Sequence, residues 1–201
     1  MSNDSTRQKI MDAAAQLFYY NGFKGTSVRA ITEKANVNVS SINYHFKNKQ
    51  GLIEYMTVDY FEKYLKLLEH ITQDEQALTD FNVLFKAIEE IIHYKYERFQ
   101  FSCLIQRELS LDNMFIRELF STYVAKEKYL FKKMLKGFSE EWGFKALEQD
   151  ILYIQLKSLI NGPFVYAHDW QDHYQWDQSG EMFIKKYMET FKKWFYRNVN
   201  V

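Results

Sequence analysis

The sequence has few of the residues that interrupt helices or cross-link chains. It holds one proline, seven glycines and one cysteine in 201 residues. So few turn residues disfavour an all-β protein, whose many short strands need them. The single cysteine excludes an internal disulfide and is typical of a reducing compartment. The first residues hold no apolar run before a small-residue cleavage site, so we expect no secretory leader. With no uncharged apolar run of about 18 residues, we expect a cytoplasmic protein without a transmembrane helix.

Apolar residues, by contrast, are plentiful. They make up 47% of the chain, with 18% aromatic, which is enough to bury a sizeable core. Their helical spacing over long segments predicts an all-α fold. Net charge is zero but uneven, because residues 1–52 hold seven basic and three acidic side chains, giving +4 there and −4 elsewhere. A basic N-terminal quarter indicates an anionic partner such as nucleic acid, although such an asymmetry also arises by chance.

Three short helices are predicted in the first fifty residues, and turn residues mark where they begin and end. The S-x-x-Q pattern of Ser5 and Gln8 is a capping box, typical of a helix start. Asn21-Gly22 is expected to end this helix, because glycine readily adopts the left-handed conformation found just after helices. Thr26 is the expected N-cap of the second helix, which continues with apolar residues at helical spacing.

The second and third helices are predicted to form a helix-turn-helix pair. Between them, Asn36 can adopt a positive φ and Asn38 can cap the third helix, expected at 39–45. In this motif the second helix of the pair enters the DNA major groove while its apolar side packs on the first. Ile42 is the expected anchor, and the outward residues are Ser40, Ser41, Asn43 and Tyr44. A solvated surface hairpin is the alternative interpretation.

The run FYYNGFKGTSVRAITEKANVNVSSINYHFKNKQGLI, residues 18–53, resembles the N-terminal DNA-binding domain of the TetR family of bacterial transcriptional regulators. The shared features are Gly-Phe after the first helix, TSVRAIT opening the second, KANV at the turn, YHF ending the third and NKQGL opening the fourth. The resemblance implies a helix-turn-helix DNA-binding domain at 1–48 and a helical ligand-binding and dimerisation domain at 49–201. It also implies a bacterial protein that is nucleoid-associated when bound to DNA.

The same resemblance implies roles for single residues. Phosphate contacts are implied for Thr26, Ser27, Tyr44, His45 and Lys49. Contacts to bases are implied for Val39, Ser40, Ser41 and Asn43. Lys47 is a basic residue at the end of the third helix, where a phosphate contact is also expected. Asn43 departs from the family pattern, because many relatives carry an aromatic residue there, and this change is expected to shift base preference.

Beyond residue 48 the sequence predicts further helices. One long helix is expected from Lys49 to about His70, and the others at 78–98, 101–109, 112–138, 146–168 and 179–198. Gly162-Pro163 is expected to remove a backbone donor from its helix and to kink it, with either a cavity beside Phe164 or a packing adjustment as the result. The stretch from Lys95 to Arg98 is expected to be a charged helical face.

The many aromatic residues of the C-terminal part allow two interpretations. They can line a pocket for a small apolar effector, for which the candidates are Phe101, Phe120, Tyr123 and Phe164. They can equally fill the core between helices. The last two helices are expected, from the resemblance, to pair with a second copy in a four-helix bundle. The candidate interface residues are Leu152, Leu156, Leu159, Phe183, Tyr187 and Phe191, and these can instead face the chain's own core.

No catalytic pattern is found, and we expect a non-enzyme that needs no cofactor or metal. Cys103 has no neighbouring base in the sequence and is expected to be a small buried residue. His168 and His173 are five residues apart and do not share a helical face. With Asp169 and Asp172 they are expected to form a solvated turn rather than a metal site.

Three functions remain open at this point. The leading one is a dimeric repressor that binds a palindromic operator and is released by a small apolar effector. The alternative is a DNA-binding protein whose C-terminal domain engages a protein partner such as the cell-division machinery. NVSSINYHFKNKQGL and IQRELSLDNMFIRELFSTYVAKEKY resemble the Bacillus RefZ branch of the family, which binds DNA and restrains assembly of the cell-division ring. The third is a small-molecule-binding protein whose DNA contacts have decayed, against which the intact caps and turn argue.

Overall fold

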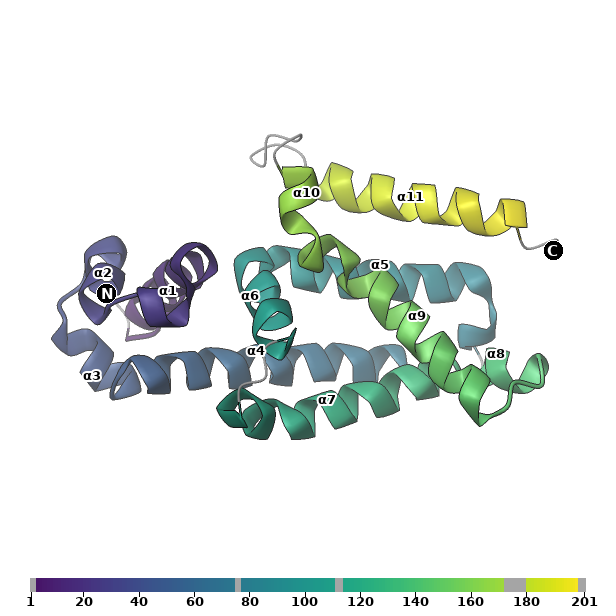
Figure 1. Cartoon of the computed structure of the whole chain (residues 1–201), viewed down its shortest axis with the longest axis horizontal. Coiled ribbons are helices and arrows are strands. Elements are labelled where there is room, and N and C mark those ends of the chain that lie inside the picture. The colour runs from purple at the N-terminus through teal and green to yellow at the C-terminus, as the bar shows by residue number, and fades with distance from the viewer. Residues whose placement is uncertain (1–2, 75–76, 111–113, 172–179, 199–201) are drawn as a thin grey trace. The chain divides into compact units, whose positions relative to one another are not determined.

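The computed structural model describes residues 3–74, 77–110, 114–171 and 180–198, and these contain helices and no β-strand (Figure 1). The predicted all-α class is therefore confirmed. The chain divides into two compact units. The first unit is formed by Met1–Lys63 and Phe99–Phe120, and the second by Tyr64–Arg98 and Ser121–Val201. The functional boundary predicted after residue 48 stays a prediction; a helix begins there, at Lys49.

The observed helices follow the predicted ones closely. They are α1 (Asn3–Gly25), α2 (Val28–Ala35), α3 (Ser40–Phe46), α4 (Lys49–Ile71), the 3-10 helix η1 (Ala77–Thr79), α5 (Phe81–Glu97), α6 (Phe99–Ser110), α7 (Met114–Met134), α8 (Lys136–Glu141), α9 (Ala146–Val165), α10 (Ala167–Gln171) and α11 (Gly180–Asn198). Two predicted helices are each divided, at Leu135 and at Tyr166. In the described ranges, no helix combines the length and apolarity that crossing a bilayer requires.

The start of α1 differs from the prediction. The helix begins at Asn3, so Ser5 lies inside its first turn instead of capping it. The Gln8 amide donates to the Asp12 carboxylate at 2.8 Å, one helical turn further on. An i, i+4 pair on the helix surface therefore replaces the expected capping box.

Near its end α1 is interrupted, and side chains of other residues in the first unit donate hydrogen bonds to its carbonyl groups. Gly22 has φ 72° and interrupts the helix at the place where its end was predicted, although α1 continues to Gly25. The Thr26 hydroxyl lies 2.9 Å from the Gly22 carbonyl and 3.1 Å from that of Leu17. Arg107 of α6 donates to the carbonyls of Phe18 and Tyr19 at 2.9 and 3.2 Å. These contacts satisfy acceptors that a helix end would otherwise leave exposed.

Lys49, the first residue of α4, ties the same region to the long helix. Its ammonium donates to the carbonyls of Phe23 and Thr26 at 2.8 and 2.7 Å. It also lies 4.4 Å from the centre of the Phe23 ring, a cation–π contact. Phe23 lies in the last turn of α1 and Thr26 directly follows that helix, so this one side chain fixes where α2 begins relative to α4.

The buried face of α4 is the one that the sequence predicts. Its members are Leu52, Met56, Tyr60, Tyr64 and Leu68, all of them buried. Each fully buried large apolar side chain contributes about 1.5–3 kcal/mol relative to exposure. In the first unit, the Tyr60 hydroxyl also forms a 3.0 Å hydrogen bond with Ser102 of α6, so this polar atom is satisfied inside the core.

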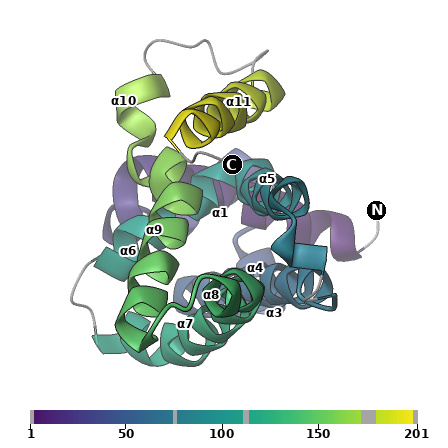
Figure 2. The same cartoon turned by 90° about the vertical axis from the view of Figure 1, so that its right-hand side faces the viewer.

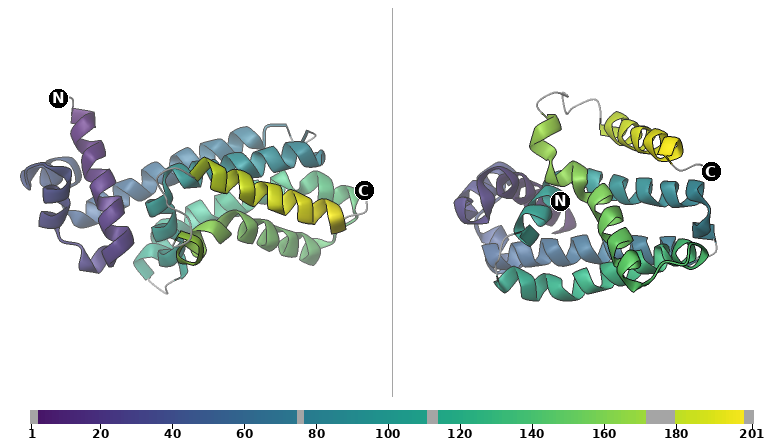
Figure 3. Two further views of the ribbon diagram at one scale, coloured as in Figure 1. Left: turned by 90° about the horizontal axis from the view of Figure 1, so that it is seen from above. Right: turned by 45° about the vertical axis from the view of Figure 1, so that its right-hand side comes forward.

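In the second unit, α5 and α11 lie side by side and run antiparallel (Figures 1 and 3). Aromatic rings join them: Phe195 lies 4.8 Å from Phe81, and Phe191 lies 5.7 Å from Phe85, between ring centroids. Such tilted and edge-on ring pairs add to the free energy of burial. The aromatic residues at this end of the unit therefore fill its core, as one of the two interpretations expected.

Two lysines connect α7 to α9 in the same unit. Lys132 lies 2.7 Å and Lys128 3.4 Å from the Asp150 carboxylate. Figure 2 looks onto α8, with α7 and α9 beside it. The exposed position of these ion pairs makes their individual contribution small, on the order of 0–1 kcal/mol. They nevertheless mark the surface at which the two helices meet.

Pro163 lies inside α9, and side chains of α10 and α11 supply the missing donors. Proline has no N–H, so it cannot bond to the carbonyl of Leu159 four residues earlier. The Tyr187 hydroxyl donates to that carbonyl at 2.7 Å. The Trp170 indole N–H donates to the carbonyl of Pro163 at 2.9 Å, and its ring stacks on Phe183 at 3.8 Å between centroids. The sequence predicted the missing donor but not what replaces it.

The Lys49 contact gives a first prediction. Lys49→Met is expected to lower the free energy of unfolding by about 1–3 kcal/mol, because two backbone carbonyls lose their donor. Urea denaturation followed by circular dichroism measures this change. Lys47→Met is the matched control, since Lys47 is exposed, and it is expected to change stability by less than about 0.5 kcal/mol. Equal effects of the two substitutions would contradict the assigned role of Lys49.

The Pro163 site gives a second prediction. Tyr187→Phe is expected to cost about 1–3 kcal/mol, because it leaves the Leu159 carbonyl without a donor. In a Pro163→Ala background the restored N–H supplies that bond, so the same substitution should cost less than about 0.5 kcal/mol. Denaturation of the four proteins in this cycle measures the coupling. Additive effects would show that the two residues act independently.

Candidate nucleic-acid interface

Ser27, rather than Thr26, caps α2. The Ser27 hydroxyl accepts a 3.0 Å hydrogen bond from the backbone N–H of Ala30. The predicted N-cap was therefore one residue too early. Thr26 is only 2% exposed and its hydroxyl faces the α1 carbonyls, so the structure uses it to hold the start of α2. Of the two residues predicted here to contact phosphate, only Ser27 is exposed.

The turn between α2 and α3 has the geometry that the sequence predicts. Asn36 is left-handed, with φ 53° and ψ 52°. Its N–H donates to the Glu33 carbonyl at 3.2 Å, and the N–H of Val37 donates to that of Thr32 at 3.0 Å. This pair of bonds is a Schellman motif. The motif fixes the direction in which the chain leaves α2 and so the placement of α3.

The apolar side of α3 is buried and its N-terminus is capped. Ile42 and Phe46 are both in the core, which confirms Ile42 as the anchor. The Asn38 side-chain oxygen accepts hydrogen bonds from the backbone N–H and the hydroxyl of Ser40, each at 2.9 Å. Asn38 therefore caps α3, as predicted. The hydroxyl proton of Ser40 is used in this hydrogen bond to Asn38.

The other side of α3 carries most of the residues predicted to contact bases. Of these, Ser40, Asn43 and Val39, which directly precedes α3, are exposed, while Ser41 is half-buried. Of the predicted phosphate contacts on α3, Tyr44 is exposed and His45 is half-buried. Tyr44 is 75% exposed and its ring meets that of His45 edge-on at 4.9 Å. A short helix with one anchored side and one polar exposed side has the form of a recognition helix. Asparagine and serine on that side can bond to base edges.

Exposed basic residues lie on α1 and α2 and directly after α3. Lys47 is exposed, as are Lys24 and Lys34. Arg29 of α2 is exposed and pairs with Glu33 at 2.8 Å. An exposed pair of this kind contributes little, so the guanidinium can exchange the carboxylate for a phosphate. Arg29 was not among the predicted DNA contacts; its position as a basic residue in the first turn of α2 was the available signal.

Lys47 and Gly51 make the junction between α3 and α4 tight. Lys47 has φ 68° and ψ −47°, and the N–H of Asn48 donates to the Phe46 carbonyl at 2.8 Å, which defines a γ-turn. The Asn48 side chain accepts from the N–H of Gly51 at 2.8 Å and caps α4, as predicted. A Cβ at Gly51 would lie 2.1 Å from the Phe46 oxygen, so this position requires glycine. Lys49 is engaged in its own carbonyl contacts beside this junction.

The predicted pocket residues do not line one described pocket. Phe101 is buried in the first unit, against Tyr60 at 5.5 Å between centroids, and Phe164 is buried in the second. Tyr123 is half-buried, and the Phe120 side chain lies outside the described residues. A described pocket of about 240 Å³ lies elsewhere, between α7, α8 and α9, and is lined by Lys132, Leu135, Lys136, Ser139, Glu140 and Gln149.

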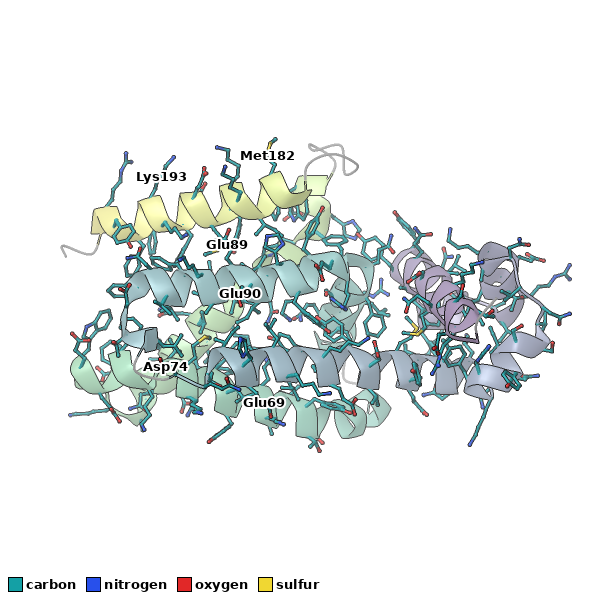
Figure 4. The ribbon with its side chains drawn as sticks, turned by 180° about the vertical axis from the view of Figure 1, so that it is seen from behind. Glu69, Asp74, Glu89, Glu90, Met182 and Lys193 are labelled. Atoms are coloured by element: carbon teal, nitrogen blue, oxygen red, sulfur yellow. The ribbon has the colours of Figure 1, made fainter. Side chains whose placement is uncertain are left out.

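The predicted dimer residues mostly face the chain's own second unit. Leu156 is buried, and Leu152, Leu159, Phe183, Tyr187 and Phe191 are half-buried. Tyr187 and Phe183 belong to the contacts around Pro163, and Phe191 packs on α5. The exposed apolar and aromatic residues of α9 and α11 are others: Leu147, Ile151, Ile154, Val165, Met182, Trp194 and Tyr196. Met182 and Lys193 lie on the side of α11 turned away from α5 (Figure 4).

The expected charged face at residues 95–98 is wrong in part, because Lys95 is only 2% exposed. Its ammonium lies 4.4 Å from the centre of the Tyr64 ring. The Tyr64 hydroxyl donates at 3.0 Å to Glu127, which also accepts a 2.7 Å hydrogen bond from Lys157. We name Lys95, Glu127 and Lys157 the buried charge cluster. Helical spacing from the buried Ile88, Ile91 and Ile92 was the signal that placed Lys95 on the inner face.

Of the residues considered for catalysis or metal binding, Cys103, His168 and Asp169 belong to the described part of the chain. Cys103 is buried, as expected, and burial raises the pKa of its thiol far above the usual range. His168 and Asp169 are exposed, while Asp172 and His173 lie outside the described residues. Across the described part of the chain, no three His, Cys, Asp or Glu side chains stand close enough to hold a metal ion.

Comparison with known proteins identifies the helix-turn-helix and the chain that follows it. The family model "Bacterial regulatory proteins, tetR family" matches residues 10–56. The "Probable HTH-type transcriptional regulator YttP" of Bacillus subtilis is 33% identical over 190 residues, which cover 94% of this chain and 92% of that protein. The icaADBC negative transcriptional regulator IcaR of Staphylococcus epidermidis is 24% identical over 154 residues, covering 70% and 83% of the two chains.

Solved structures share the fold. The transcriptional regulator FadR of Bacillus subtilis, solved with stearoyl-CoA, has a TM-score of 0.67 at 17% identity and covers 90% of this chain and 95% of its own. These similar proteins are transcriptional regulators rather than enzymes. A helix-turn-helix with an anchored, exposed second helix, together with a relative matched along nearly all of both chains, establishes that the chain belongs to the TetR family of bacterial transcriptional regulators.

Proposed function

We propose that this chain is a homodimeric repressor that binds a palindromic operator through α3 and is released by a small-molecule effector. The observation that carries the proposal is the division of α3 into a buried apolar side and an exposed polar side. Two copies related by a two-fold axis place two such helices at half-sites about one helical turn apart, roughly 34–36 Å. Effector binding acts by favouring a state in which that spacing is lost.

Base and phosphate contacts divide between two groups of exposed residues. Asn43 is the proposed reader of base edges, with Val39 and Ser40 beside it, since an amide can bond to adenine in the major groove. Ser27, Tyr44 and Lys47 are the proposed phosphate contacts, because all are exposed around the ends of α2 and α3. Thr26 and Lys49 act indirectly in this proposal, by fixing the α1–α2 connection.

The proposed dimer surface is the exposed stripe of α9, together with the outer side of α11. Leu147, Ile151 and Ile154 follow one another at intervals of four and three residues, so they share one face of α9. All three are exposed in the single chain. Met182 and Trp194 add exposed apolar area on α11. Burying such a stripe against its symmetry mate removes it from water, as obligate dimers require.

The effector is proposed to bind in the second unit. FadR, which shares the fold, was solved with stearoyl-CoA, so a body of this architecture can hold an acyl compound. A ligand that prefers one of two states by about 1–3 kcal/mol changes the affinity for DNA 5–150-fold. The second unit also contains buried charged residues, which a purely structural helical core does not need.

One observation favours the alternative, in which the C-terminal domain engages a protein partner such as the cell-division machinery. Trp142 and Tyr196 are 45% and 47% exposed beside the aromatic core formed by α5, α8 and α11. Large aromatic residues are enriched where proteins meet. This surface does not overlap the proposed DNA-contacting residues, so a partner of this kind is compatible with operator binding.

The DNA-binding proposal predicts different effects for two neighbouring residues. Asn43→Ala is expected to lose about 1–3 kcal/mol of discrimination at one base pair of each half-site, whereas Lys47→Ala weakens binding to all sequences and lowers the salt slope by about one. Selection of bound duplexes from a random library by each purified protein measures the first effect. Titrations at several salt concentrations measure the second. An unchanged preferred sequence in Asn43→Ala would overturn the orientation of α3.

The dimer proposal predicts that Ile154→Glu separates the protomers, because it places two buried charges across the symmetry axis. Sedimentation analysis at micromolar concentration is expected to give a dimer for the natural chain and a monomer for this variant. Gln155→Glu, at the neighbouring exposed position, is the control and should remain dimeric. A natural chain that is monomeric and still binds palindromes tightly would rule out the bundle.

A further inference from the structure

A side-chain contact between α1 and α4 reaches the end of α3. The Arg7 guanidinium of α1 donates to the Tyr55 hydroxyl of α4 at 3.0 Å, and its carbon lies 5.6 Å from the centre of the Tyr55 ring. The Tyr55 ring in turn meets that of Phe46 edge-on, at 5.5 Å between centroids. Phe46 is the last residue of α3 and one of its two buried anchors. Arg7 is therefore two side-chain contacts away from the C-terminal end of α3.

Both members of the Arg7–Tyr55 contact are accessible to a partner. The Arg7 side chain is 33% exposed, and Tyr55 is 38% exposed. Arg7 also forms an ion pair with Asp4, three residues earlier, whose side chain is 83% exposed. An exposed pair of this kind contributes little to stability. The guanidinium can therefore exchange the carboxylate for another anion while it keeps its bond to Tyr55.

The chemistry of Arg7 suits a phosphate. A guanidinium presents five N–H donors in a planar fork, which matches two phosphate oxygens at once. The hydrogen bond to Asp4, and then that to Tyr55, raise the pKa of Arg7 above its ordinary value, so the group stays charged. One nitrogen of the fork donates to Tyr55 and another to Asp4. This arrangement restricts the orientation of the fork before an anion binds, which lowers the entropy cost of binding.

Lys49, the phosphate contact that the family resemblance implies for α4, has its ammonium engaged elsewhere. Two backbone carbonyls accept from it, and it lies against the Phe23 ring. The other proposed phosphate contacts belong to α2, to α3 and to the residue after α3. Arg7 precedes residues 10–56, which the family model matches, so a contact made by Arg7 is not part of the matched pattern.

We infer that Arg7 binds a phosphate of the DNA backbone beside the base pairs that α3 reads, with Tyr55 holding its guanidinium and Asp4 as the anion that the phosphate displaces. This inference rests on the proposed DNA-binding function and adds to it a contact from α1. Contacts of this kind fix the register and orientation of a protein on the duplex. The competing explanation is a structural link between α1 and α4, which needs no phosphate.

The salt dependence of binding separates the two explanations. The probe is the duplex recovered by selection from the random library, labelled for fluorescence anisotropy and titrated with the full chain at several salt concentrations. Arg7→Gln is expected to weaken binding about 3–10-fold and to lower the salt slope by about 0.9, as the loss of one phosphate contact does. Lys9→Gln removes an equal charge from an exposed position on the opposite face of α1 and should change the slope by less than about 0.3. An unchanged slope in Arg7→Gln, or equal changes in both variants, overturns the inference.

Neutral phosphates identify the contact directly. Replacement of one phosphate at a time by a methylphosphonate removes its charge and leaves the bases unaltered. For the natural chain, one such replacement in each half-site is expected to weaken binding about 3–10-fold, and in Arg7→Gln the same replacement should have less than about a twofold effect. A structural link between α1 and α4 predicts additive effects at every position. Full additivity therefore contradicts the inference.

Asp4→Asn tests the exchange of anions and leaves the contact between Arg7 and Tyr55 in place. Removal of the competing carboxylate is expected to tighten binding about 2–5-fold, and this gain should disappear in the Arg7→Gln background. Asp12→Asn, at another exposed position of α1, is the matched control and should have less than about a 1.5-fold effect. A gain that persists without Arg7, or that Asp12→Asn equals, contradicts the inference.

The same titrations distinguish this inference from the proposed function. Selective binding to the recovered duplex with an unchanged slope in Arg7→Gln refutes the phosphate contact alone. A natural chain that binds no duplex selectively refutes the proposed function, and the inference with it.

Discussion

Hydrogen bonding of backbone carbonyls where helices are interrupted is the constraint on which the rest of this structure depends. A helix that breaks leaves acceptors that must find donors elsewhere. Near Gly22 the donors are Thr26, Arg107 and Lys49, and around Pro163 they are Tyr187 and Trp170. In both places a side chain from one helix donates a hydrogen bond to a backbone carbonyl of another helix that is distant in sequence. The positions of α2 and of α11 follow from these few bonds.

The sequence was informative wherever structure is decided locally. Asn38 and Asn48 have the predicted cap roles, because a short polar side chain accepts from a backbone N–H two or three residues away. Asn36 adopts the predicted positive φ, which is a property of its own backbone. Periodicity likewise placed the helices and the inner face of α4. Thr26 shows the limit of this reasoning. A threonine before a helix can cap it or bond backward, and the break at Gly22 decides between the two.

Side chains with two plausible partners could not be placed from sequence. Leu156 and Tyr187 lie on helices whose several faces carry apolar or aromatic residues, so spacing alone does not say which face meets the chain's own core and which meets a second copy. Lys95 looked solvated because its neighbours are charged, yet it lies on the isoleucine face of α5. The candidate interface on α3 was easier, since a seven-residue helix with two buried anchors has one exposed side only.

Pro163 and Tyr187 have a consequence for how this chain can change over evolutionary time. The proline is tolerated because a phenol from another helix bonds to the carbonyl that it leaves free. The hydroxyl of Tyr187 is needed because position 163 is a proline, so substitution of the proline relaxes selection on the tyrosine. In descendants of this chain the two positions should vary together: lineages that replace the proline lose the need for the tyrosine, whereas lineages that keep it retain a hydroxyl at position 187.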